Sequence, residues 1–177
     1  MKIVIIGAGA MGSIYGGRLS VHNEVYLVDK NEAVLEAIRT HGLIVEEAGE
    51  RNVYHPDTAE CTGHLGQADL ILLFVKSTVS ANALKENRSL IGKNTRIMTL
   101  QNGAGHEQLL EQFVSPEHII IGTTEDNGML IAPGHVKRGG TGITNLGMLV
   151  HDESLYLQKL KQVFDECGFT VKIHDNI

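Results

Sequence analysis

The feature that most constrains the fold is the stretch KIVIIGAGAMGS at residues 2–13. Residues 2–6 form a short, mostly β-branched apolar run, which is typical of a strand buried on both faces of a parallel sheet. Gly7, Gly9 and Gly12 then follow with G-x-G-x-x-G spacing, directly before a helical pattern. In this context the first glycine permits a tight turn, the second lets the backbone approach a diphosphate, and the third lets helix and strand pack closely. The stretch predicts a dinucleotide-binding unit; a strand, turn and helix without a ligand is the alternative interpretation.

Two further glycines, Gly16 and Gly17, fall inside the helix that follows this loop. A glycine in the middle of a helix costs roughly 0.5–1 kcal/mol relative to alanine. We therefore expect this helix to approach a sheet or a ligand closely at these two positions.

The rest of the chain alternates between the periodicities of strands and helices. Further strand-like apolar runs occupy residues 24–29, 68–76, 96–101 and 118–122. Helix-like stretches occupy residues 11–20, 32–40 (with Asn31 as a candidate N-cap), 79–91, 107–113 and 153–166. A last strand-like run lies within residues 168–177. This alternation predicts an α/β fold with a Rossmann-like, doubly wound, mostly parallel sheet.

Two segments depart from this alternation. Residues 42–55 show alternating runs around an Ala-Gly turn, and residues 128–149 show alternating apolar positions around Pro133-Gly134. Both patterns are typical of β-hairpins. We predict two antiparallel hairpins added to the parallel sheet.

The composition is that of an ordinary globular chain with an acidic balance. Of 177 residues, 42% are hydrophobic and 20% charged, and the formal net charge is −6. We expect no nucleic-acid partner, because the net charge would repel a phosphate backbone. The two cysteines, Cys61 and Cys167, have no C-x-x-C spacing and the nine histidines are scattered, so we expect no metal site. With no recognisable leader, we expect a cytoplasmic protein without a membrane partner.

An acidic residue ends the second predicted strand. Asp29 lies 22 positions after Gly7, near the distance of about 20 residues at which a carboxylate meets the adenosine ribose hydroxyls. Such a carboxylate accepts hydrogen bonds from both hydroxyls and repels a 2′-phosphate, which favours NADH. In the competing interpretation Asp29 caps the following helix, and Lys30 with its loop accepts NADPH.

Two polar residues follow adjacent predicted strands, where a parallel sheet binds its ligands. Lys76 ends the run ADLILLFVK, and Asn102 follows the next strand in LQNGAG. Taken singly, Lys76 is a solvated strand end, and Asn102 with Gly103 is a turn. Taken together, they place an ammonium and an amide near the nicotinamide end of a bound dinucleotide.

These motifs in this order resemble the N-terminal domain of the ketopantoate reductase family. The segments that carry the resemblance are KIVIIGAGAMGS, FVKS, LQNGAGHEQLL, IGTT and PGHVKRGGTGITNLG. The resemblance covers nearly the whole chain and implies NAD(P)H-dependent reduction of a 2-oxo acid to a 2-hydroxy acid, with 2-dehydropantoate as substrate in pantothenate biosynthesis. The residues that it implies for cofactor binding are Gly7, Ala8, Gly9, Ala10, Met11, Gly12, Lys76, Asn102, Gly103 and Asn127. Asp29 is added to this set by the spacing argument above.

The same resemblance implies that the catalytic lysine of the family, in a W-x-K motif, lies beyond Ile177. We therefore expect no catalytic residue within these 177 residues, with Lys76 and Asn102 in supporting roles and the fragment inactive alone. Residues 1–167 are expected to form the NAD(P)-binding domain, and residues 168–177 a last strand and the start of a linker to a helical C-terminal domain that this sequence lacks.

Two departures from the family leave alternatives open. Members commonly carry a basic residue after the second strand, where this chain has Asp29, and TEDNG after IGT is more acidic than usual. An NAD-dependent D-2-hydroxyacid dehydrogenase of the same superfamily is one alternative, and a non-catalytic dinucleotide-binding module is another. The expected partner is a small-molecule 2-oxo acid; a homodimer is left open.

Overall fold

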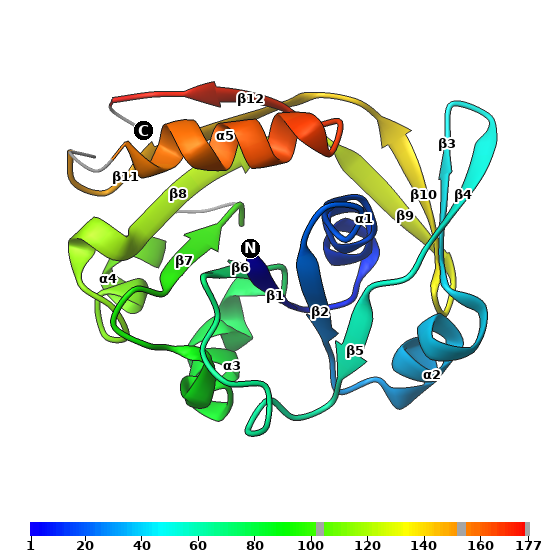
Figure 1. Cartoon of the computed structure of the whole chain (residues 1–177), viewed down its shortest axis with the longest axis horizontal. Coiled ribbons are helices and arrows are strands. Elements are labelled where there is room, and N and C mark those ends of the chain that lie inside the picture. Colours follow the sequence, from blue (N-terminus) through cyan, green and yellow to red (C-terminus); the bar gives the residue numbers. More distant parts are fainter. Residues whose placement is uncertain (102–104, 152–154, 176–177) are drawn as a thin grey trace.

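The computed structural model describes residues 1–101, 105–151 and 155–175 as two β-sheets with helices packed around them (Figure 1). The main sheet has eight strands, in the order β5 (Asp57–Ala59), β2 (Glu24–Val28), β1 (Lys2–Ile6), β6 (Leu70–Leu73), β7 (Arg96–Thr99), β8 (Ile119–Thr124), β11 (Ile143–Met148) and β12 (Thr170–Ile173). The six strands from β5 to β8 are parallel, and β11 and β12 run in the opposite direction. The predicted doubly wound, mostly parallel α/β sheet is confirmed.

Helices cover both faces of the main sheet. The α-helices are α1 (Ala10–Leu19), α2 (Glu32–His41), α3 (Ser80–Glu86), α4 (His106–Leu110) and α5 (Tyr156–Glu166). Helices α1 and α5 belong to the hydrophobic cluster on one face, and α3 and α4 to the cluster on the other (Figure 1). The chain order reverses between β1 and β6, so the carboxyl ends of these two strands flank the crevice in which such sheets bind ligands.

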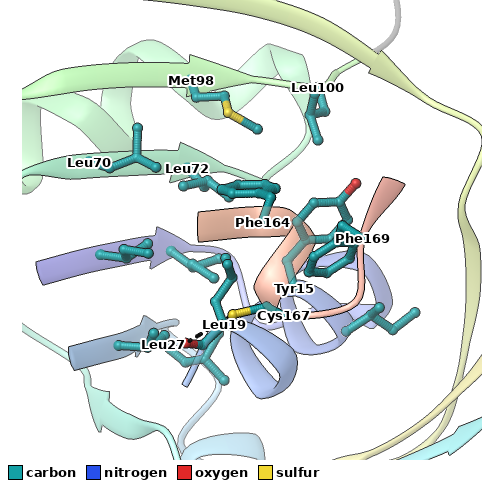
Figure 2. Packing of buried hydrophobic residues seen from close by; sticks show 14 of the residues in the cluster. Tyr15, Leu19, Leu27, Leu70, Leu72, Met98, Leu100, Phe164, Cys167 and Phe169 are labelled. Carbon is teal, nitrogen blue, oxygen red and sulfur yellow. Dashed lines mark hydrogen bonds between the residues drawn. The ribbon is translucent and has the colours of Figure 1, made fainter. Parts of the chain in front are cut away.

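Three aromatic rings fill the core between α1, α5 and the sheet (Figure 2). The ring of Tyr15 stacks on Phe169 at 4.4 Å between centroids and meets the edge of Phe164 at 6.1 Å. All three residues are at least 97% buried, and a fully buried side chain of this size contributes about 1.5–3 kcal/mol. Phe169 lies outside the 1–167 boundary and β12 pairs in parallel with β11, so the described residues 168–175 add to this core and sheet; the division at residue 167 stays a prediction.

The two predicted hairpins exist, but they form a sheet of their own. Its order is β4 (Glu50–Tyr54), β3 (Leu43–Glu47), β10 (His135–Gly140) and β9 (Asn127–Ala132), with β3 and β10 joined in parallel. The expectation that the hairpins extend the main sheet was wrong in this respect. The segment 128–149 also holds a third strand, β11, and it is this strand that joins the main sheet beside β8.

The two glycines within α1 explain how the second sheet is attached. A Cβ at Gly16 would lie 2.7 Å from Cδ2 of Leu27 in the main sheet, and one at Gly17 would lie 2.9 Å from Cδ2 of Tyr54 in the second sheet. Both separations are too short for real atoms. The helix α1 is therefore held between two sheets, and the close approach that these glycines predict is to the sheets on both sides.

The predicted helix at residues 79–91 is divided. It consists of the short 3₁₀ turn η1 (Ser77–Val79), α3, and a second 3₁₀ turn η2 (Arg88–Leu90). Asn87 separates α3 from η2: its amide Nδ2 donates to the carbonyl of Ala83 at 2.8 Å, and its Oδ1 accepts from Thr62 at 2.7 Å. Side-chain bonds of this kind compete with helix continuation.

Candidate functional site

The glycine loop joins β1 to α1 under tight steric constraint. Gly7 has φ +108°, and a Cβ there would lie 2.8 Å from the backbone carbon of Phe74. A Cβ at Gly12 would lie 1.8 Å from the carbonyl oxygen of Gly7. A Cβ at Gly9, by contrast, meets no described atom within 4 Å. The outer side of the loop is thus open at the position where a diphosphate would need to approach.

The N-terminus of α1 follows directly and suits an anion. Gly9 is the N-cap residue, and within the described residues no side chain caps the first turn and no acidic residue lies in it. The first N–H groups of a helix have no partner within the helix and carry a partial positive charge. The residues present therefore fit a diphosphate group, which accepts such N–H bonds.

Asp29 is tied to the loop by backbone hydrogen bonds. Its Oδ2 accepts from the N–H of Ala8 at 2.7 Å, and its Oδ1 accepts from the N–H of Asn31 at 2.9 Å. The residue at the N-cap of α2 is Asn31, which makes no side-chain cap bond there. Asp29 therefore links the end of β2 to the glycine loop, and on the other side its bond reaches the N-cap residue of α2 but, among the described residues, no N–H inside that helix.

A cleft of about 490 Å³, named here the Asp29 cleft, opens beside this carboxylate. Its walls come from the ends of β1 and β2, from the segment after β5, and from α3. It is lined by Ile6, Gly7, Val28, Asp29, Lys30, Glu60, Cys61, Val75, Val79, Asn82, Ala83, Glu86 and Asn87. Apolar walls with a few polar groups at the rim are typical of a site for an aromatic ring such as adenine.

A second cleft of about 310 Å³, the Lys76 cleft, lies on the other side of the loop. It is lined by Met11, Phe74, Val75, Lys76, Ser77, Leu100, Gln101, Thr124 and Asp126. Val75 borders both clefts, and Met11 from the first turn of α1 borders only this one. The two clefts thus lie on either side of the diphosphate loop, as the two ends of a dinucleotide require.

Gln101 joins the strand ends that form the floor of the Lys76 cleft. Its amide nitrogen donates to the carbonyl of Val75 and to the hydroxyl of Ser80, at 3.0 Å for the latter, and its oxygen accepts from Thr99 at 3.2 Å. Lys76 itself is exposed, with an extended backbone directly before η1. The segment that carries Lys76 is therefore held by bonds from the neighbouring strand end.

Two buried hydroxyls, those of Tyr15 and Thr144, support Thr124 from below. The hydroxyl of Tyr15 lies 3.0 Å from Oγ1 of Thr124 and 2.8 Å from Oγ1 of Thr144, and the two threonine oxygens are 3.3 Å apart. Burial raises the pKa of Tyr15 to about 12, so its hydroxyl stays protonated at neutral pH. The cluster connects α1, β8 and β11 beneath the Lys76 cleft.

A buried ion pair stands next to this cluster. The guanidinium of Arg138 donates through Nε and Nη2 to Oδ1 of Asp126, at 3.0 and 2.6 Å, and through Nη1 to Glu47 at 2.7 Å. The side chains of Arg138 and Asp126 are 1% and 0% exposed. Because Asp126 precedes β9, Glu47 belongs to β3 and Arg138 to β10, these bonds join the border of the Lys76 cleft to the second sheet.

The other predicted site residues divide into two groups. Asn102 and Gly103 lie outside the described residues. Asn127 begins β9 and is exposed; a Cβ at Gly139 would lie 1.9 Å from its Oδ1, so its amide covers the backbone of β10. Asn127 is not among the lining residues of either cleft, whereas its neighbour Asp126 lines the Lys76 cleft.

Sequence reasoning missed Gln101, Thr124 and Glu86 as cleft residues. Gln101 ends the predicted strand 96–101 and Thr124 follows the predicted strand 118–122; such a strand-end position was the available signal, since it is what singled out Lys76. Glu86 gave no signal, because it lies on the exposed side of a predicted helix and only the packing of α3 brings it to a cleft.

The described residues show neither a cluster of metal ligands nor a membrane-spanning helix. They contain no cluster of three or more histidine, cysteine, aspartate or glutamate residues that could hold a metal ion. Within the same residues, none of the helices combines the length and the apolar character that a membrane span requires.

Comparison with known proteins gives consistent matches. The model of the family described as "Ketopantoate reductase PanE/ApbA" matches residues 3–151. The curated 2-dehydropantoate 2-reductase of Lactococcus lactis subsp. lactis (strain IL1403) is 36% identical over 183 residues, covering 100% of this chain and 58% of the relative.

Solved structures agree with this match. The ternary structure of D-mandelate dehydrogenase with NADH and anilino(oxo)acetate superposes with a TM-score of 0.92 at 37% identity, covering 100% of this chain and 58% of the other. The 2-dehydropantoate 2-reductase from Geobacter metallireducens GS-15 gives a TM-score of 0.91 at 28% identity, covering 99% and 58%. The chain thus spans somewhat more than half the length of these proteins. With the family model matched over most of its residues, this chain belongs to the ketopantoate reductase family.

Proposed function

We propose that this chain is the part of a 2-oxo acid reductase that binds the nicotinamide dinucleotide. The observation that carries the proposal is the position of the glycine loop between two clefts, with Asp29 bonded to the loop on one side and Lys76 on the other. The diphosphate would lie on the N–H groups from Gly9 to Gly12, adenosine in the Asp29 cleft and nicotinamide toward the Lys76 cleft. Ala8 belongs to the loop and Ala10 and Met11 to the first turn of α1, while Asn102, Gly103 and Asn127 stay predicted contacts.

The reaction proposed for the whole protein is reduction of 2-dehydropantoate to pantoate. When bound, the cofactor supplies the hydride. The role of this chain is to orient the dinucleotide and to stabilise the charge that develops on the substrate's carbonyl oxygen. A fixed ammonium near that oxygen lowers the barrier, and Lys76 is the exposed cation at the border of the cleft. Proton donation is assigned, by family resemblance, to a lysine beyond Ile177.

A D-2-hydroxyacid dehydrogenase activity is the second candidate. The similarity to D-mandelate dehydrogenase, at 37% identity and a TM-score of 0.92, favours it. That protein was solved with NADH, and its bound anilino(oxo)acetate is a 2-oxo acid derivative. Both candidates use the same two clefts and differ in the side chain of the oxo acid.

NADH is the cofactor proposed for this chain. Asp29 ends β2, and its two oxygens each accept one backbone N–H, which leaves each oxygen a further lone pair for a ribose hydroxyl. A 2′-phosphate at the same place would meet a like charge. Asp29→Ala should therefore reduce the preference for NADH over NADPH by about tenfold or more, because charge-assisted bonds of roughly 1.5–3 kcal/mol are lost.

The test has two arms. In the first, the 177-residue chain is titrated calorimetrically with NADH and NADPH. In the second, the longest product of its reading frame is assayed for NADH and NADPH oxidation with 2-dehydropantoate and with 2-oxoisocaproate. The oxo acid with the higher kcat/KM names the activity. Binding without turnover of either oxo acid would instead support a non-catalytic dinucleotide-binding module, and the absence of any binding would refute the proposal.

A further inference from the structure

An ion pair crosses the mouth of the Asp29 cleft. Lys30 follows β2 on one side, and Glu86 ends α3 on the other. The Nζ of Lys30 lies 2.8 Å from Oε1 and 2.8 Å from Oε2 of Glu86. Both residues line the cleft, so the ammonium is held by both carboxylate oxygens at the place where the adenosine ribose is expected.

Glu86 is itself held in position from within α3. The amide Nδ2 of Asn82 donates to its Oε1 at 2.8 Å, and the two residues are one helical turn apart. The hydrogen bond from Lys30, followed by smaller contributions that include the bond from Asn82, lowers the pKa of Glu86. The carboxylate is therefore ionised near neutral pH and, with the bond from Asn82, is turned toward Lys30.

The charges around the cleft are unbalanced. Its charged lining residues are Asp29, Lys30, Glu60 and Glu86, so Lys30 is the only Lys or Arg among the described residues of the lining. The next cation after Lys30 in the sequence, Arg39 on α2, is engaged by Glu32 at 2.6 Å and Glu36 at 2.7 Å and is not part of the lining. Lys76 and Lys85 each adjoin a lining residue but do not line this cleft themselves. Any 2′-phosphate in this cleft would depend on Lys30 for a positive partner.

We propose that Glu86 is a positioning residue that sets cofactor choice by holding Lys30 away from a 2′-phosphate. This inference rests on the proposed dinucleotide function. NADH leaves the Lys30–Glu86 pair intact because it carries no group at the 2′ position besides the hydroxyl. NADPH must either break the pair or place its phosphate beside Asp29 and Glu86 together. Discrimination thus comes from two sides of the cleft, repulsion by Asp29 and withdrawal of Lys30 by Glu86.

The experiment is a titration of the 177-residue chain with NADH and with NADPH, for the unmodified chain and for Glu86→Gln, Lys30→Met and the double variant. Glu86→Gln keeps the side-chain length and an oxygen for Asn82, and removes the charge. We expect it to raise the affinity for NADPH about fivefold, the effect of one screened charge contact, and to change that for NADH less than twofold. In the Lys30→Met background the same substitution should gain at most about twofold. The gain should shrink at 0.5 M salt, because exposed charges are screened.

The matched control is Glu36→Gln on α2, which removes one acidic charge from an exposed ion pair outside the cleft. Equal gains for NADPH in the two variants would show a general charge effect and overturn the inference, as would an unchanged NADPH to NADH ratio in Glu86→Gln. If the unmodified chain binds neither cofactor, the proposed function itself fails, and the inference with it. If both bind and only the ratio is unresponsive, the failure concerns Glu86 alone.

Discussion

The Asp29 cleft and the Lys76 cleft differ in what lies beneath them. At the Asp29 cleft the side-chain charges are at the surface: Lys30 and Glu86 are paired in solvent, with side chains 76% and 42% exposed. At the Lys76 cleft the polar groups continue into the core, where Tyr15 and Thr144 are 0% exposed and Asp126 is fully enclosed with Arg138. The comparison teaches that one end of the site can be altered by surface charge alone, whereas the other end is part of the folded core.

The largest expected effect is a loss of stability when the buried ion pair beside the Lys76 cleft is broken. Asp126→Ala removes one carboxylate partner of Arg138 and leaves Glu47 as the remaining carboxylate bonded to the guanidinium among the described residues. Breaking a buried pair in this way costs about 3–5 kcal/mol of the free energy of unfolding. Urea denaturation measures the loss. Asp57→Ala, at an exposed position on β5, is the control and should change stability by no more than about 0.5 kcal/mol. A similar small loss in Asp126→Ala would show that the pair does not support the cleft.

The next effect concerns the loop between the two clefts. In Gly12→Ala the new Cβ would lie 1.8 Å from the carbonyl oxygen of Gly7, so the loop must move away from β1. We expect a destabilisation of roughly 1–3 kcal/mol, as for other overpacked sites, and loss of measurable NADH binding. Gly63→Ala is the control, because a Cβ there would meet nothing within 4 Å and the φ of Gly63 is not in the left-handed region. Gly49→Ala would be unsuitable, because Gly49 has a positive φ that strains any alanine. Retained NADH affinity in Gly12→Ala would argue against the diphosphate assignment.

The Asp29 side was more readable from the sequence than the Lys76 side, for a physical reason. Gly7 to Asp29 is a single strand, loop, helix and strand unit, so spacing along the chain translates directly into geometry. The Lys76 cleft draws its lining from four distant segments, which include Met11, Gln101 and Thr124, and the meeting of these segments depends on strand order in the sheet. Strand-end positions predicted where Lys76 lies, but no pattern signalled the hydroxyl cluster below it.

The hairpins show the same limit of sequence information. Their turns and alternation were sufficient to predict β3 with β4 and β9 with β10. The pairing of β3 with β10 joins residues some 90 positions apart and is accompanied by the buried bond from Arg138 to Glu47. The periodicity of the sequence carries no information about such long-range pairing. The sequence alone therefore could not show that the two hairpins form a sheet separate from the main sheet.

A third prediction sharpens the functional contrast between the two ends. Lys76→Ala in the longest product of the reading frame should lower kcat/KM for the preferred oxo acid by at least about tenfold, equal to roughly 1.4 kcal/mol of transition-state stabilisation. Affinity for ADP-ribose, which reaches the Asp29 cleft without nicotinamide, should be unchanged. Lys85→Ala on α3, also exposed but outside both clefts, is the matched control. A change in kcat/KM no larger than that of the control would make Lys76 an ordinary solvated strand end.

The smallest expected effect at neutral pH is a loss of stability in Tyr15→Phe, and the pH dependence of that loss tests the hydroxyl cluster. Tyr15→Phe keeps the ring packed on Phe169 and removes the bonds to Thr124 and Thr144, which should cost about 1 kcal/mol of the free energy of unfolding at pH 7. The pKa of Tyr15 is raised from 10.0 to about 12 in the folded protein, chiefly by burial. Its contribution to stability is therefore fully present below pH 10 and is lost as the pH rises toward 12, because the unfolded chain ionises first.

Two pKa units correspond to about 2.7 kcal/mol, more than the hydroxyl contributes at pH 7. The stability curves of the unmodified chain and Tyr15→Phe should therefore cross between about pH 10 and 11, above which the phenylalanine variant is the more stable. Urea denaturation from pH 7 to 11.5 measures both curves. Tyr26→Phe is the comparison variant: the hydrogen bond to the exposed Glu24 raises the pKa of Tyr26 and is also what the hydroxyl contributes at pH 7, so its two stability curves should converge at high pH without crossing. Parallel stability curves for the unmodified chain and Tyr15→Phe would mean that the Tyr15 hydroxyl reaches solvent. The polar groups beneath the Lys76 cleft would then not be buried in the way that distinguishes this cleft from the Asp29 cleft.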